Sequence, residues 1–152
     1  MKKYVLILVF FITSSVFADE VGVILGSTTG LSAKFNLPTQ NRAIDMGLGY
    51  KMNSTSSLSL HADYLFENAR FIRVKTADVF AMYYGLGARF ININSDGVNK
   101  GKTSFGPRAP LGLEYKINNP DISFFGEVAI AVDLIPESLV EVQAGIGVRL
   151  RF

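Results

Sequence analysis

Polar and apolar residues alternate with a period of two along most of the chain after residue 18. Strict alternation is typical of β-strands that bury one face, whereas no stretch keeps a helical period. The pattern occurs in eight runs, at 20–26, 30–37, 42–51, 57–67, 80–92, 104–117, 122–134 and 139–152. The sequence therefore predicts an all-β domain of eight antiparallel strands in an up-and-down barrel.

The breaks between these runs carry residues that favour turns. Most are short, at 27–29, 38–41, 53–56, 94–97, 118–121 and 136–138. The break at 68–79 is less regular, and its segment 71–74 either extends a strand or covers the barrel mouth. Pro107 and Pro110 fall inside the sixth run, and proline removes a donor from the strand ladder. We therefore expect a bulge or a late strand start there.

Two kinds of barrel fit the alternation, and they differ in which face points inward. A soluble lipocalin-like barrel would turn its apolar face toward a bound apolar ligand, and a membrane barrel would turn it toward lipid. The glycines favour the membrane barrel, because small residues are useful inside a narrow barrel but not on a solvated face. They share the polar face, at Gly47, Gly49, Gly85, Gly87, Gly106, Gly112, Gly145 and Gly147.

Four residues depart from this division of the faces. Gly126 lies on the apolar face, whereas Ile24, Tyr83 and Phe125 lie on the polar one. The aromatic residues of the apolar face nevertheless support a membrane barrel, because they fall near strand ends and form two girdles of the kind found at membrane interfaces. With the N-terminus placed in the periplasm, the periplasmic girdle holds Phe35, Tyr64, Phe66, Tyr84, Tyr115, Phe124 and Phe152, and the outer girdle holds Tyr50, Phe90 and Phe105.

The first 18 residues have the pattern of a secretory signal peptide. Lys2 and Lys3 precede the apolar run 4–12, and the small residue Ala18 follows at a suitable cleavage position. The run is too short for a membrane-spanning helix, which needs about 20 apolar residues. The sequence therefore predicts a signal peptide at 1–18 and a barrel domain at 19–152.

Composition excludes several classes of function. The chain has no Cys and one His, so neither a disulfide framework nor a typical zinc site is expected, and no metal or other cofactor is predicted. Removal of Lys2 and Lys3 leaves 13 basic and 13 acidic residues in the mature part. The basic charge of the precursor therefore gives no support for nucleic-acid binding.

The C-terminal run ends in alternating apolar residues, Ile146, Val148, Leu150 and Phe152. This ending resembles the C-terminal signature of bacterial outer-membrane barrels, and the chain as a whole resembles the small eight-stranded barrels of the OmpA transmembrane domain and OmpX type. The resemblance implies a Gram-negative outer-membrane location and recognition of the ending by the barrel-assembly machinery. It also implies periplasmic chaperones during export, lipid and lipopolysaccharide as surroundings, and a monomer.

The polar face carries charges that would point into the lumen of a membrane barrel. Buried charges must pair, so we expect a salt-bridged network that largely fills the lumen. The expected members are Lys34, Asp45, His61, Asp63, Arg89, Arg108, Glu114, Glu127, Asp133, Glu141, Arg149 and Arg151, and Lys116 lies on the same face. The alternative is a narrow polar path for small ions, or a binding pocket. A wide pore is not expected, because eight strands leave little free bore.

Ser59, His61 and Asp63 lie on one strand face at two-residue spacing, which raises the possibility of a hydrolase, and lipid A deacylases are barrels of this kind. A catalytic triad usually draws on separate elements, and no oxyanion hole is visible in the sequence. We therefore expect a non-catalytic barrel with a structural or surface-interaction role, in which His61 joins the lumen network.

Overall fold

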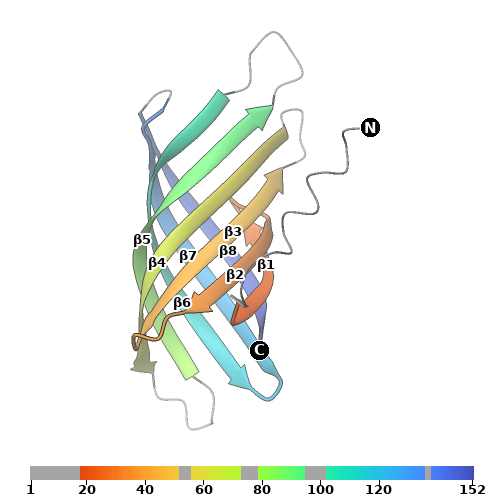
Figure 1. The fold of residues 1–152 in the computed structure, drawn as a ribbon, viewed down its shortest axis with the longest axis vertical. Coiled ribbons are helices and arrows are strands. Elements are labelled where there is room, and N and C mark those ends of the chain that lie inside the picture. The colour runs from red at the N-terminus through yellow and green to blue at the C-terminus, as the bar shows by residue number, and fades with distance from the viewer. Residues whose placement is uncertain (1–17, 52–55, 73–78, 95–101, 136–137) are drawn as a thin grey trace.

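The described part of this computed structural model comprises residues 18–51, 56–72, 79–94, 102–135 and 138–152. The predicted signal peptide, apart from Ala18, therefore lies outside the described residues. Eight strands form one closed sheet in which each strand pairs antiparallel with the next and β8 pairs with β1 (Figure 1). The strands are β1 (Glu20–Gly26), β2 (Gly30–Asn36), β3 (Arg42–Lys51), β4 (Ser56–Ile72), β5 (Val79–Asn94), β6 (Lys102–Asn118), β7 (Asp121–Asp133) and β8 (Leu139–Arg151).

The predicted all-β, up-and-down barrel is confirmed, and the predicted runs match the strands closely. β1 and β3 have the predicted bounds, and β4 departs most, because it continues past the predicted end to Ile72. The first part of the irregular break thus extends a strand, whereas 73–78 lie outside the described residues. In the part of the chain that the structure describes, no helix is long and apolar enough to cross a membrane.

The strands are staggered around the barrel by ten residues. Followed through the paired positions of β2 to β7, Glu20 of β1 leads to Glu141 of β8. Across the β1–β8 seam, however, Glu20 pairs with Arg151, ten residues further along β8. This stagger tilts the strands relative to the barrel axis and brings residues from distant rows together in the lumen. The end of the barrel at which Phe152 N–H donates to the Asp19 carbonyl is called the terminal end below.

The two prolines of β6 disturb the sheet less than expected. β6 begins at Lys102, so the strand does not start late, and its register with β5 is the same on both sides of Pro110. Toward β7, the ladder runs to Arg108↔Ala131 and resumes with an isolated Phe105↔Ile135 bridge, which adds one residue on the β7 side. A bulge-like offset therefore occurs beside Pro107. At Pro110 the register with both neighbouring strands stays the same, because regular pairs lie on either side of it.

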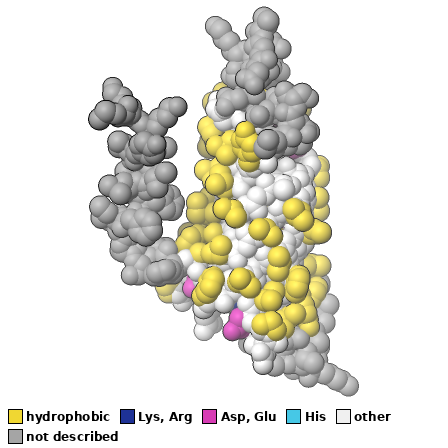
Figure 2. All heavy atoms as spheres, turned by 90° about the vertical axis from the view of Figure 1, so that its right-hand side faces the viewer, with side chains coloured by type: hydrophobic (Ala, Val, Ile, Leu, Met, Phe, Trp, Pro, Cys, Tyr) yellow, Lys and Arg dark blue, Asp and Glu magenta, His cyan; other side chains and the backbone are white. Residues whose placement is uncertain are grey.

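Apolar side chains cover the outside of the barrel and charged side chains fill its inside. Val142, Ile146 and Leu86 are each about two-thirds exposed, whereas Lys34, Asp45 and Glu114 are buried. Figure 2 shows one face of the wall, where hydrophobic side chains extend along most of its length and acidic ones appear only toward its lower edge. The lipocalin-like alternative, with its apolar face inward, is therefore wrong.

The bulky apolar residues of the polar face do point into the lumen, and glycines on neighbouring strands make room for them. Tyr83 is buried against Gly112, and a Cβ added to that glycine would lie 2.2 Å from the tyrosine ring. Phe125 lies over Gly147 in the same way, at 2.3 Å. The strand glycines of the polar face thus allow rings to lie flat against the barrel wall.

Candidate functional site: the charged lumen

Ten of the twelve side chains expected in the lumen network are buried there. Glu141 and Arg151, near the two ends of β8, are only partly buried. Apart from the contact between Arg151 and Asp121, the described ion pairs form four groups along the lumen, each centred on one or two cations. Eight strands contribute to these groups, so the network ties together parts of the sheet that share no backbone ladder.

The first group lies nearest the terminal end and is centred on Lys34 and Lys116. Lys34 contacts Glu114, with an N–O distance of 2.6 Å, and also contacts Glu67. Lys116 lies 3.2 Å from Glu114 and 3.7 Å from Glu20. Two ammonium groups on β2 and β6 therefore share carboxylates from β1, β4 and β6.

Arg149 of β8 is the centre of the second group. Its guanidinium donates to Asp45 at 2.7 Å and to the Ser32 hydroxyl at 2.8 and 3.0 Å, and it reaches Glu114 at 3.4 Å. The guanidinium carbon also lies 3.8 Å from the centre of the Phe125 ring, which is a close cation–π contact. Arg149 thus connects β8 with β2, β3, β6 and β7.

Arg108 of β6 forms the third group at mid-lumen. Its guanidinium contacts both Asp63 and Glu127 and donates to the Gln143 side chain at 3.1 Å. The Tyr83 hydroxyl donates to Glu127 at 3.1 Å. Arginine suits this position because its planar fork presents five donors at fixed angles.

The fourth group lies toward the opposite end, where Arg89 pairs with Asp133 and Glu141. Arg89 donates to both Asp133 oxygens, at 2.9 and 2.8 Å, and to Glu141 at 3.0 Å. Bidentate pairing of this kind is stronger and more directional than a single contact. Arg151 forms a separate contact at the terminal end, 3.2 Å from Asp121.

Three pockets along the lumen of the described residues differ in size. Pockets of about 280 Å³ and 220 Å³ occupy the terminal and opposite ends. The pocket beside Arg108 and Glu127 has a volume of about 10 Å³, which is room for about one water molecule. The smallest of these three pockets therefore lies beside the third group.

Four further residues of the network are not among those predicted from the sequence. Glu20, Glu67, Ser32 and Gln143 all contact cations in the lumen. Each lies on the inward face of its strand, so the alternation itself could have found them. Glu20 begins the first predicted run and Glu67 ends the fourth.

The three residues with hydrolase-like spacing do not form a relay. The Ser59 hydroxyl donates to the Gly49 carbonyl at 3.4 Å, and Asp63 pairs with Arg108. Among the described residues, no hydrogen bond joins His61 to either of them; its ring instead packs on Gly47. No group of three or more His, Cys, Asp or Glu side chains in the described ranges could hold a metal ion.

The residues expected in the aromatic girdles lie on the outside of the barrel. They include direct cross-strand pairs, Phe66 with Tyr84 and Phe90 with Phe105. The apolar residues of the expected assembly signal also face outward, and Phe152 is 86% exposed.

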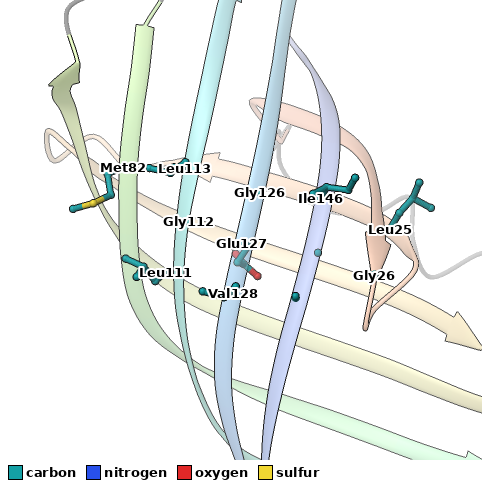
Figure 3. A pocket seen from close by; sticks show the side chains of 12 residues that line it. Leu25, Gly26, Met82, Leu111, Gly112, Leu113, Gly126, Glu127, Val128 and Ile146 are labelled. Atoms are coloured by element: carbon teal, nitrogen blue, oxygen red, sulfur yellow. The ribbon is translucent and has the colours of Figure 1, made fainter.

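An apolar groove of about 790 Å³ crosses this outer wall over Gly126. Figure 3 shows Met82, Leu111 and Leu113 on one side of Gly126 and Ile146 and Leu25 on the other.

A closed eight-stranded barrel with a charged, paired lumen and an apolar wall defines the class of transmembrane β-barrels. Among solved structures, the chain is similar to one described as the crystal structure of Neisserial surface protein A (NspA). The two are 16% identical, with a TM-score of 0.45, and the alignment covers 88% of this chain and 94% of that chain. No family model and no curated protein sequence matches the chain.

Proposed function

We propose that this chain is a non-catalytic integral protein of the bacterial outer membrane, with a closed lumen and a structural or surface-interaction role. The observation that carries the proposal is the distribution of its side chains, with paired charges inside the barrel and apolar residues outside. In water, such an outer wall would expose far more contiguous apolar surface than a soluble monomer tolerates. In lipid, the same wall is the favourable one, and closure of the sheet pairs the backbone groups.

The outer membrane is supported by features of the sequence and by the wall. The signal-peptide pattern of residues 1–18 predicts export, and the alternating C-terminal ending is of the type that the barrel-assembly machinery recognises. We propose that the outward aromatic residues form the two girdles expected from the sequence, at the membrane interfaces where such rings are favourable. We extend the proposal to periplasmic chaperones as transient partners, and to a monomer surrounded by phospholipid and lipopolysaccharide.

A closed lumen is supported by the contacts of Arg108 and the small free volume beside it. Two carboxylates and one amide contact its guanidinium, and the adjoining pocket holds about one water. An ion passing this point would have to displace a paired guanidinium, which is costly in a low-dielectric interior. The network is therefore proposed to fix the barrel's shape and to prevent leakage.

Membrane fractionation combined with gel mobility tests the proposed location and fold. The protein is expected in the outer-membrane fraction, extractable only with detergent, and its mobility in dodecyl sulfate gels should change when the sample is boiled. A deletion of residues 2–18 is the matched control and should leave the protein in the cytoplasm. Recovery of the full chain in the detergent-free soluble fraction would contradict the proposal.

A further inference from the structure

Arg42 differs from every other charged strand residue whose side chain the structure describes, because it faces outward. It is the first residue of β3, at the terminal end, and its side chain is exposed on the apolar wall. The other charged side chains of the described strands face the lumen, where most are buried. A single unneutralised cation on a lipid-facing surface calls for a specific partner, because an isolated charge is unfavourable near hydrocarbon.

Two aromatic side chains contact Arg42, and a third stacks on one of them. The cross-strand partner of Arg42 is Phe66, and the partner of Phe66 on the next strand is Tyr84. The guanidinium carbon lies 5.4 Å from the Phe66 ring centre, and Arg42 Nη1 donates to the Tyr64 hydroxyl at 3.0 Å. Phe66 stacks on Tyr84 with ring centres 5.5 Å apart, and Tyr64 meets its edge at 5.2 Å. These four residues are called the Arg42 surface below.

The Arg42 surface has an apolar part and an unused set of donors. A guanidinium has five N–H donors, and the Tyr64 hydroxyl takes one of them. The residues that the structure describes offer Arg42 no carboxylate within ion-pair distance. The rings beside it provide an apolar surface, and they belong to the periplasmic girdle that the sequence predicts.

We infer that the Arg42 surface binds the phosphate of a glycerophospholipid, with the guanidinium on the phosphate and the acyl region against Phe66 and Tyr84. Arginine is favoured for phosphate because its fork matches two phosphate oxygens. Basic groups at a membrane surface recognise anionic headgroups in this way. The inference rests on the proposed membrane function, and the terminal end would then face the phospholipid leaflet of the outer membrane.

Native mass spectrometry of detergent-solubilised protein, with added phosphatidylglycerol, tests this site. The wild type should retain one phosphatidylglycerol more than Arg42→Gln at limiting lipid, and its affinity should be about five-fold higher. Arg42→Lys should keep part of the affinity, because it retains the charge but not the fork. Phe105→Ala, which removes an outward ring at the opposite end, is the matched control and should bind as the wild type does.

Three outcomes would overturn the site. The first is equal retention by the wild type and Arg42→Gln, and the second is the same difference with diacylglycerol, which lacks phosphate. The third is displacement of phosphatidylglycerol by lipid A at equal concentration, which would assign Arg42 to the other leaflet. Heat-modifiable mobility of every variant separates these results from failure of the proposed function, because a chain that is soluble without detergent would overturn both.

Discussion

The effect of enlarging a residue in this barrel depends on the free space on its own face of the sheet. A Cβ added to Gly87 would lie 2.1 Å from the Ala62 carbonyl oxygen and 2.2 Å from an Asp63 oxygen. The same atom added to Gly126, on the outer wall, would meet only Ile146, at 3.9 Å. An added methyl group would therefore clash with its neighbours at Gly87 but would fit at Gly126.

We expect Gly87→Ala to destabilise the barrel by about 1–3 kcal/mol, because backbone and a buried ion pair would have to shift. Gly126→Ala is the matched control and should be neutral or stabilising by up to about 1 kcal/mol, since it removes only the conformational freedom of glycine. Urea titration in detergent, followed by gel mobility or circular dichroism, measures both. Equal effects would show that Gly87 is not confined as described.

At the centre of the lumen, Arg108 balances Asp63 and Glu127. Arg108→Met should cost about 3–5 kcal/mol of unfolding free energy, because it leaves two buried carboxylates without their partner. Combination with Asp63→Asn and Glu127→Gln should recover much of the loss, since no uncompensated charge then remains. The same urea titration tests this, and a single variant as stable as the wild type would show that the third group contributes nothing.

Each strand carries two independent patterns, one for the wall and one for the lumen. Alternation alone was sufficient to predict β1 and β3 within their observed bounds, because period-two patterns survive wherever one face is buried. The sequence leaves open whether β4 continues past residue 67, because Glu67 and Asn68 are adjacent polar residues of the kind found at turns. Nor could the sequence tell which charges pair: Lys34 meets Glu114 only because of the stagger between strands 80 residues apart.

β8 offers a test of the outward pattern at the level of a strand. Ile146 is 66% exposed on the wall, and Ile146→Lys should cost about 2–4 kcal/mol in lipid vesicles, as a lysine does near the midplane of a bilayer. Asn119→Lys, in the turn between β6 and β7, is the matched control and should have little effect. In a soluble barrel, lysine at an exposed isoleucine would be harmless, so an unchanged stability would argue against lipid contact.

As a whole, the barrel is proposed to have a closed lumen, and the charged groups inside that lumen are mostly negative. The four groups contain eight carboxylates and five cations. Wild-type protein in a planar lipid bilayer is therefore expected to show no steady conductance, and any brief openings should favour cations over anions. Long-lived openings in the wild type would contradict the closed lumen, and anion preference would contradict the charge surplus.

The contacts of Arg149 also bear on the order in which the barrel assembles. This residue belongs to the last strand, yet its partners Ser32 and Asp45 precede it by 117 and 104 residues. Until β8 arrives, these groups stay hydrated in an open sheet, and the entropy of bringing the ends together has not been recovered. Pairing of β8 with β1 closes the sheet and brings Arg149 to these partners. We therefore expect a chain truncated before β8 to remain incompletely assembled and sensitive to protease.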